Sequence, residues 1–485
     1  MKFQKVLLLI VILFGVFCTF KSPSDPDFGW HYKYGEYLIQ HGHILRENIF
    51  SYTFTDYKWA NSYWISQATI YLSHYYLGHL LAGLLFAIVL SASTIYYVKT
   101  ISKNFQPIMP LMVFSCLLLF LEFSIYVITG RPMYFSSIFL MFLVVILLRE
   151  NRKGYLWFLP SLFLIWANTH ADFVLGLVIL GLFIVDKLLE RPLLKITKEK
   201  VMIVAIGLFS VVVTLVNPYG VGLWQTLIKE SYPFQFNHIS EWVPVTTGNV
   251  YYFATYCALL GIFVSALIGA RHKLPLWYVL SLGLFCIFSV RSQYFFRIAA
   301  ILGIYAFLVF WSPYLRDLKN TFSPGLLKKF KAGFLTFLTI STLVVVTVFL
   351  TEISPKQKYP KEALDFALAN NIQGNVFNYY SWGGYMIWEY PQIKTFIDGR
   401  MPSWREGSKS VFEDYVKVVD TPRENIKILD NYNVNWILYP ASSSLSKFLR
   451  GPNSGWKEIY SDDIASVFVK TPGFVETTRF DIMSP

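Results

Sequence analysis

Residues 133–149 read MYFSSIFLMFLVVILLR, an apolar run that follows Arg131 and ends at Arg149. A helix needs about 17–25 such residues to cross a hydrocarbon core about 30 Å thick, and similar runs recur along the chain. Hydrophobic residues make up 55% of the 485 residues, charged residues make up 15%, and the mean hydropathy is +0.46. This composition is too apolar for a soluble globular protein. The sequence therefore predicts an α-helical polytopic membrane protein.

The apolar runs define eleven expected membrane helices. The first, with Lys2 and Lys5 before it, is interpreted as a retained helix, because no small-residue cleavage site follows it. The expected spans are residues 5–20, 80–98, 107–127, 133–149, 154–169, 172–188, 200–217, 250–269, 274–290, 295–312 and 332–351.

The distribution of Lys and Arg predicts the orientation. The net charge is +12, but the basic residues lie in short connections between apolar runs and form no single soluble face, which argues against nucleic-acid binding. They are concentrated at the N-terminus and in alternate connections, so these segments are expected in the cytoplasm of a protein of the cell membrane. An odd number of spans then places the C-terminal region outside.

This topology divides the chain into two expected domains. Residues 1–351 form a transmembrane domain with a first extracytoplasmic loop at 21–79. Residues 352–485 are more polar and predict a small extracytoplasmic α/β domain. In this domain PKEALDFALANN predicts a helix, NVFNYY, TFIDGR, NWILYP and SVFVK predict strands, and Gly383-Gly384 predicts a turn.

The first loop opens with acidic residues. Asp25-Pro26 is typical of a helix start, with Asp25 as N-cap and proline at the first helical position. Asp27 then lies in the first turn, with His31 one turn further on the same face. A capping and dipole role explains Asp25 well. It explains Asp27 less well, so Asp27 is the leading candidate for catalysis, with Asp25 and His31 as further candidates.

Other ionisable residues fall on the same predicted side of the membrane. Arg131, His170, Asp172, Arg291 and Arg297 lie in short turns or at the ends of spans. A single arginine there is explained by snorkelling to headgroups. Together these residues favour a bound ligand, because charges at this depth are costly, and arginine forks suit a phosphate.

Several strings resemble a known superfamily. They are DPDFGWHYKYGEYLIQHG (25–42), FSYTFTDYKW (50–59), WANTHADFVLG (166–176), NPYGVGLW (217–224) and ISEWVP (239–244). In order and sidedness they resemble the polytopic membrane glycosyltransferases of the GT-C superfamily, in particular bacterial relatives of protein O-mannosyltransferases and lipid-sugar transferases.

The resemblance implies an activity. It implies transfer of a hexosyl or pentosyl group from a polyprenyl-phosphate donor to a hydroxyl acceptor on a glycolipid, cell-surface polysaccharide or protein. An acidic residue of the first external loop acts there as base or aligns the acceptor, a role that falls to Asp27, with Asp25 as the alternative. Arg131, Arg291 and Arg297 would bind phosphate by position and chemistry. The alternative is a non-catalytic polysaccharide or lipid-carrier translocase or assembly protein, which needs a polar pathway through the bundle. Few charged residues lie in mid-span, and Glu122 is the nearest candidate.

The tail carries a second resemblance. YYSWGGYMIW (379–388) is similar to the acceptor-recognition element of oligosaccharyltransferases, which makes Trp382 and Tyr385 candidates for substrate binding. The acidic position of that element is occupied by Gly384, and an aromatic corner packed into the domain is the competing interpretation. FIDGR (396–400) is interpreted either as an acidic loop facing the site or as a plain turn. The pairs Asp25/Asp27 and His170/Asp172 suit Mg²⁺ or Mn²⁺, although no ligand spacing requires a metal.

Overall fold

The structure is a computed structural model that divides into two compact units. Unit 1 contains Met1–Asp25, His31–Leu45 and Trp59–Ser354, and unit 2 contains Pro26–Trp30, Arg46–Lys58 and Pro355–Pro485. The residues described are 2–20, 25–105, 108–126, 131–149, 153–190, 196–229, 234–239, 241–245, 250–321, 359–452 and 454–471, together with single residues between 325 and 347.

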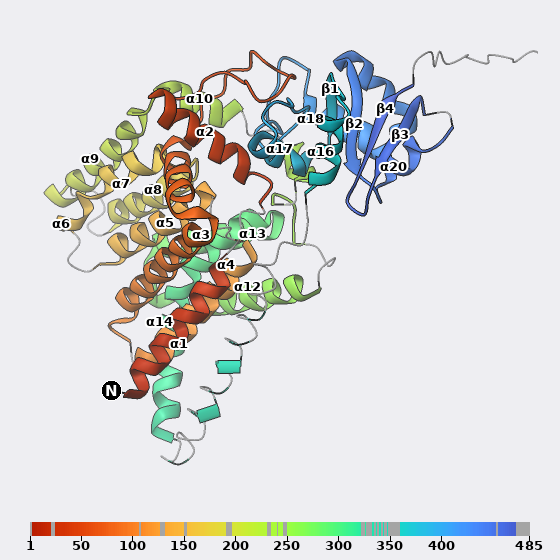
Figure 1. The fold of residues 1–485 in the computed structure, drawn as a ribbon. Coiled ribbons are helices and arrows are strands. Elements are labelled where there is room, and N and C mark those ends of the chain that lie inside the picture. Colours follow the sequence, from red (N-terminus) through yellow and green to blue (C-terminus); the bar gives the residue numbers. More distant parts are fainter. Residues whose placement is uncertain are drawn as a thin grey trace, which may run out of the picture. The chain divides into compact units, whose positions relative to one another are not determined.

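Unit 1 is built from helices, and helix α2 (Phe28–His41) starts in unit 2 and continues in unit 1 (Figure 1). The other helices of unit 1 are α1 (Lys2–Thr19), α3 (Trp64–Ser102), α4 (Ile108–Tyr126), α5 (Pro132–Leu148), α6 (Lys153–Leu156), α7 (Leu159–Ala167), α8 (Phe173–Leu189), α9 (Lys198–Val212), α10 (Val221–Lys229), α11 (Gln235–His238), α12 (Val250–Ala270), α13 (Leu276–Arg291) and α14 (Phe296–Thr321), with 3₁₀ turns η1 (Val213–Leu215), η2 (Arg271–Lys273) and η3 (Gln293–Phe295).

The predicted spans from 5–20 to 295–312 each coincide with a helix or a pair of short helices. Three described helical stretches are long and apolar enough to cross a membrane, namely Trp64–Ser102, Phe253–Lys273 and Gln293–Tyr314, and shorter apolar helices accompany them. The predicted span 332–351 falls largely outside the described residues. These helices confirm the prediction of a mostly helical membrane protein, and the predicted number of eleven spans stays a prediction.

Helix α3 is longer than the predicted span 80–98 because two helices join at Gly78. The backbone of Gly78 is left-handed, with φ 72° and ψ 169°. A residue with a Cβ rarely adopts this conformation, so glycine permits the kink there. The kink lies just before the predicted span, and the preceding turn exposes Tyr75 and Tyr76, 62% and 75% accessible. Tyrosines of this kind are typical of a membrane interface.

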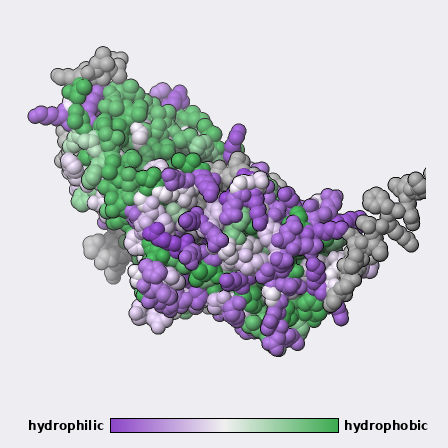
Figure 2. All heavy atoms as spheres, turned by 90° about the horizontal axis from the view of Figure 1, so that it is seen from above, coloured by the Kyte–Doolittle hydropathy of each residue, from purple (hydrophilic) through white to green (hydrophobic). Residues whose placement is uncertain are grey.

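The outer surface of the helices is apolar. Figure 2 shows apolar residues gathered over a broad surface, with hydrophilic residues elsewhere on the same face. Large exposed side chains on α3 include Leu81, Leu85, Ile88 and Val89, between 42% and 57% accessible. Such a surface costs free energy in water, at about 25 cal/mol per Å², and none in a lipid core. The surface of unit 1 therefore fits a bilayer.

Unit 2 contains a four-stranded sheet in the order β1-β2-β4-β3, drawn in blue tones in Figure 1. Strand β1 pairs in parallel with β2, and the other pairs are antiparallel. The strands are β1 (Asn375–Asn378), β2 (Val434–Pro440), β3 (Trp456–Ser461) and β4 (Ala465–Lys470), and the helices are α16 (Lys361–Ala369), η4 (Tyr380–Trp382), α17 (Gly383–Glu389), α18 (Val411–Asp420), α19 (Pro422–Asn425), η5 (Ile426–Tyr432) and α20 (Ser444–Leu449).

The sequence predicted three of these strands and the helix α16. Strand β3 was missed, and two predictions were wrong. TFIDGR (395–400) is a turn with a single bridge from Thr395 to Ser51, and Gly383-Gly384 begin a helix. The core of unit 2 lies between α16, α17 and the sheet and includes Trp382, Met386, Trp436 and Val467. Burial of each such side chain contributes about 1.5–3 kcal/mol.

Candidate functional site

A buried arginine links two carboxylates at the start of α5. Arg131 is the N-cap residue of α5, with Pro132 at the first helical position. Its Nε donates to Asp25 Oδ1 at 2.7 Å, and its Nη1 donates to the carboxylate of Glu241. The Asp25 side chain is 3% exposed, whereas that of Glu241 is 36% exposed. Arg131 thus has one buried partner and one partner open to solvent.

This pairing changes the interpretation of Asp25. Helix α2 begins at Phe28, so Asp25 is not its N-cap and Pro26 is not its first residue. The predicted helix start was therefore wrong by two residues. The physical reason is the charge of Arg131, since a charge-assisted hydrogen bond to a buried guanidinium is stronger than a bond to a helix N–H.

A second buried network joins α5, α8 and α14. Asp172, at the N-cap of α8, accepts from Arg297 Nη2 at 2.5 Å and from the Tyr294 hydroxyl at 2.5 Å. Arg297 Nη1 donates to the Met133 carbonyl at 3.0 Å and to Ser137 Oγ at 2.9 Å. The side chain of Arg297 is 1% exposed. The first turns of the three helices therefore meet at one guanidinium.

The charges around Asp172 keep it ionised. Burial raises the pKa of this carboxyl. The charges of His170 and Arg297, with hydrogen bonds from His170 and Tyr294, outweigh burial and bring the pKa well below its usual range. His170 Nδ1 lies 3.2 Å from Asp172 Oδ2 and 2.9 Å from Ser136 Oγ. The predicted neighbours His170, Asp172 and Arg297 thus form one cluster.

His31 lies in the same neighbourhood. It is 4% exposed, its Nδ1 is 3.3 Å from Gln67 Nε2, and its ring meets the edge of Tyr63 at 5.5 Å. Tyr63 is in turn 5.4 Å from the ring of His170. Burial lowers the pKa of His31 well below its usual value, and the charges of Arg131 and His170 lower it further. His31 is therefore neutral at pH 7.

The neutral state of His31 predicts an acid-sensitive fold. Below the ordinary histidine pKa of about 6.5, the unfolded chain takes up a proton at this position that the folded chain does not. The free energy of unfolding should then fall by up to about 1.4 kcal/mol per pH unit as the pH decreases from about 6.5. Replacing His31 with glutamine should remove this contribution, so that the melting temperature in detergent falls less between pH 7 and pH 5.

The exposed His43→Gln variant serves as the control and should follow the wild type. Equal pH dependence in the wild type and His31→Gln would contradict the prediction.

Asp27 lies in unit 2. Its Oδ1 accepts from the indole Nε1 of Trp30 at 3.1 Å, and Gly399 packs against the carboxylate. Within unit 2, Asp27 therefore belongs with the FIDGR turn (396–400).

The remaining candidates have different surroundings. Trp382 is 4% exposed in the core of unit 2, and Tyr385 stacks on Tyr359 with centroids 4.3 Å apart. Both side chains make packing contacts within unit 2. Arg291 ends α13 and is exposed.

Sequence reasoning missed Glu241 and Tyr294. Glu241 lies in the quoted string ISEWVP, and Tyr294 lies between the two predicted arginines in RSQYFFR (291–297). The ring of Trp242 stacks on Tyr294 at 4.3 Å, and Tyr294 N donates to the Glu241 carbonyl at 3.1 Å. A tyrosine beside two arginines at the end of a span was the available signal.

Glu122 is a further ionisable group of the bundle. It lies on α4 and is fully buried, and its two carboxylate oxygens have no hydrogen-bond partner among the described residues. Within the described part of the chain, no group of three His, Cys, Asp or Glu side chains is arranged to hold a metal ion.

The comparisons with known proteins identify the fold. No protein-family model matches the chain, and no curated protein sequence matches it. ArnT from Cupriavidus metallidurans, solved with undecaprenyl phosphate, is 12% identical over 97% of this chain and 98% of its own, with a TM-score of 0.50. The oligosaccharyltransferase of Archaeoglobus fulgidus, solved in the apo form, is 9% identical over 98% of this chain and 75% of its own, with a TM-score of 0.54.

Proposed function

Because the chain has the GT-C fold of membrane glycosyltransferases, we propose that it transfers a sugar from a polyprenyl-phosphate-linked donor to a hydroxyl acceptor. The acceptor class is a glycolipid, a cell-surface polysaccharide or a protein. In the proposed orientation the N-terminus is cytoplasmic, and the reaction takes place on the extracytoplasmic side of the cell membrane, as the distribution of basic residues predicts.

The observation that carries the proposal is the meeting of three helix N-termini at Arg297. The amino ends of α5, α8 and α14 each carry about half a positive charge from the helix dipole. Arg131 and Arg297 add full charges at the same ends. Unpaired N–H groups and positive charge at helix N-termini favour phosphate. A donor with a lipid phosphate is the ligand that this environment suits.

We assign contact with the donor phosphate to Arg131. Arg297 is buried, and both of its terminal nitrogens already donate, so it contributes charge and holds Asp172 in place. Arg131 keeps Asp25 as a permanent partner, whereas Glu241 is exposed enough to be displaced. A phosphate oxygen would replace the Glu241 carboxylate on Nη1. In the resting protein, Glu241 therefore occupies the position of the anion.

Replacing Glu241 with glutamine should strengthen donor binding. The neutral amide competes less well for Arg131 than a carboxylate does, so KM for the polyprenyl-phosphate sugar should fall about three- to tenfold. Steady-state transfer in nanodiscs measures this change. The matched control is Glu190→Gln, which changes an exposed glutamate that pairs with Lys187 and should leave KM unaltered. An unchanged or higher KM in Glu241→Gln would remove Glu241 from this role.

In the chemical step, Asp27 removes the proton of the acceptor hydroxyl while the oxygen of that hydroxyl attacks the anomeric carbon of the donor sugar. The bond from that carbon to the phosphate oxygen breaks, and the polyprenyl phosphate leaves with the electron pair. The guanidinium of Arg131 stabilises the leaving phosphate.

A reconstituted reaction tests the proposed function. The purified protein in nanodiscs is incubated with radiolabelled polyprenyl-phosphate hexose or pentose and membrane glycolipid, polysaccharide or protein fractions. Label in an acceptor, with stoichiometric release of polyprenyl phosphate, is the expected result. In proteoliposomes, movement of the donor across the bilayer without a new glycosidic bond would instead support a translocase and overturn the proposal.

A further inference from the structure

Two short segments of the first loop are built into unit 2. Pro26–Trp30 and Arg46–Lys58 belong to this unit together with the chain from Pro355 onward. Phe28 meets the ring of Trp388 edge to face at 5.0 Å, and Tyr57 stacks on Trp404 at 4.7 Å. Asp27 therefore sits in a segment whose surroundings come from the C-terminal part of the sequence.

The segment Pro26–Trp30 packs against the C-terminal part of unit 2 at glycine residues. A Cβ on Gly399 would lie 2.8 Å from Asp27 Cγ and 3.1 Å from Trp30 Nε1, and still closer to Asp27 Oδ1. A Cβ on Gly384 would overlap the carbonyl of Pro26, and a Cβ on Gly29 would overlap the carbonyl of Gly384. Real Cβ atoms essentially never approach other atoms so closely. The carboxylate of Asp27 rests directly on the backbone of the FIDGR turn.

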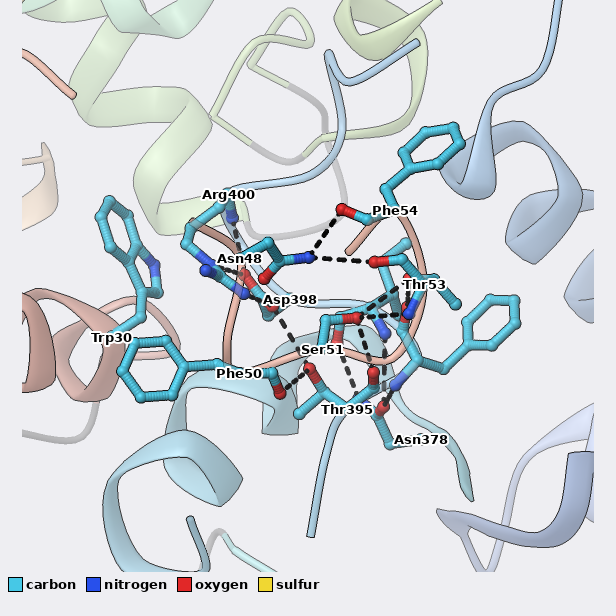
Figure 3. A network of polar contacts seen from close by, with 12 residues as sticks. Trp30, Asn48, Phe50, Ser51, Thr53, Phe54, Asn378, Thr395, Asp398 and Arg400 are labelled. Atoms are coloured by element: carbon cyan, nitrogen blue, oxygen red, sulfur yellow. Dashed lines mark hydrogen bonds and ion pairs between the residues drawn. The ribbon is translucent and has the colours of Figure 1, made fainter. Parts of the chain in front are cut away.

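Buried polar contacts fix the FIDGR turn itself (Figure 3). Asp398 and Arg400 form an ion pair at 2.7 Å in which neither side chain is exposed. Asp398 Oδ1 also accepts from the Arg400 backbone N–H at 3.1 Å. Asn378 at the end of β1 donates to the Ile397 carbonyl at 2.9 Å and accepts from the Phe396 N–H at 2.8 Å. These bonds leave the backbone under Asp27 little freedom to move.

The second loop segment, Arg46–Lys58, also binds the FIDGR turn. Ser51 Oγ donates to the Thr395 carbonyl at 2.7 Å, and Thr53 Oγ1 donates to the Phe396 carbonyl at 2.7 Å. Figure 3 shows these residues gathered around Asp398 and Arg400. Arg400 also lies over the ring of Phe50, 5.5 Å from its centroid. The turn is therefore held by β1 and by the loop together.

We propose that Gly399 is a positioning residue for the carboxylate of Asp27. This inference rests on the proposed function, in which that carboxylate takes the acceptor proton. The absence of a side chain at position 399 sets where the carboxylate lies, and the Trp30 indole sets its rotation. A methyl group at this position would push Asp27 away from the acceptor oxygen and would leave the proposed phosphate-binding residues chemically unchanged. A displacement of about 1 Å at a reacting group costs about 100-fold in rate.

Kinetics of Gly399→Ala in nanodiscs test the inference. Gly399 is not among the glycines with positive φ, so alanine meets the carboxylate and no forbidden backbone conformation. We expect kcat to fall about 10- to 100-fold, with KM for the polyprenyl-phosphate donor within twofold of wild type. Gly154→Ala is the matched control, because no atom lies within 4 Å of a Cβ built there, and it should keep the wild-type kcat.

A double-mutant cycle separates positioning from general damage. In the Asp27→Asn background the carboxylate is already lost, so adding Gly399→Ala should lower the residual transfer no further. Equal fold losses in both backgrounds, or an unchanged kcat in Gly399→Ala, would overturn the inference. Full transfer by Asp27→Asn would instead remove the base assignment of the proposed function, and this inference with it.

A second variant covers the case in which Gly399→Ala does not fold. Trp30→Phe keeps the ring and removes the N–H that donates to Asp27 Oδ1. It should lower kcat about three- to tenfold, and this loss should vanish in the Asp27→Asn background. A loss that persists there would contradict positioning through Asp27.

Discussion

Asp27→Asn is expected to lower sugar transfer about 10²- to 10⁴-fold, the usual contribution of a positioned general base. Asparagine has nearly the same shape and still accepts the hydrogen bond from Trp30 Nε1, but its amide does not take a proton. The asparagine side chain can also pack against Gly399 as the aspartate does. The loss should therefore fall on kcat, because the substitution leaves Arg131, the proposed ligand of the donor phosphate, unchanged. Initial rates with saturating donor and acceptor measure it.

The control for this experiment lies in the same unit. Asp56 is exposed in the segment Arg46–Lys58, so Asp56→Asn makes the same chemical change beside no reacting group. It should retain wild-type transfer. Normal amounts of folded Asp27→Asn with undiminished transfer would exclude Asp27 as the base and direct attention to Asp25 or His31.

Arg297→Met is expected to cost the largest amount of stability, about 3–5 kcal/mol. Methionine fills most of the volume but leaves the ionised Asp172 buried without its cationic partner. It also removes the donors to Met133 and Ser137, so the starts of α5, α8 and α14 lose their common tie. The measurement is the melting temperature of the purified protein in detergent.

Two further variants show whether the charge is responsible. Arg291→Met removes an exposed arginine at the end of α13 and should change stability by less than about 0.5 kcal/mol. Asp172→Asn added to Arg297→Met removes the stranded charge and should recover part of the loss. A double variant less stable than the single one would show that the tyrosine and histidine contacts of Asp172 matter more than its charge.

The sequence was informative wherever the signal was local. Apolar runs located the helices from 5–20 to 295–312. The basic connections predicted one side of the membrane for Arg131, Asp172 and Arg297, and in the structure Arg297 pairs with Asp172. Short strings also led to the expected fold, which the chain shares with ArnT and with the archaeal oligosaccharyltransferase.

The sequence failed where partners are distant. Asp25 has the local pattern of an N-cap, but Arg131, 106 residues away, binds it instead. The bond from Ser51 to Thr395 spans 344 residues, and no periodicity announces it. TFIDGR has the composition of a strand, yet a buried ion pair between Asp398 and Arg400 bends it into a turn. Distant partners at Asp25 and Ser51, and the buried ion pair at Asp398, overrode local propensity at these positions.

The incorporation of the first loop into unit 2 has a consequence for biosynthesis. A ribosome makes the chain from the N-terminus, so Phe28 and Ser51 leave it long before Trp388 and Thr395 exist. Loop closure over such separations is slow. Until the last quarter of the chain is made, the segments Pro26–Trp30 and Arg46–Lys58 lack their C-terminal partners, and the first loop of the nascent protein is incomplete. A chain truncated before β1 would retain its membrane helices and lack an assembled first loop.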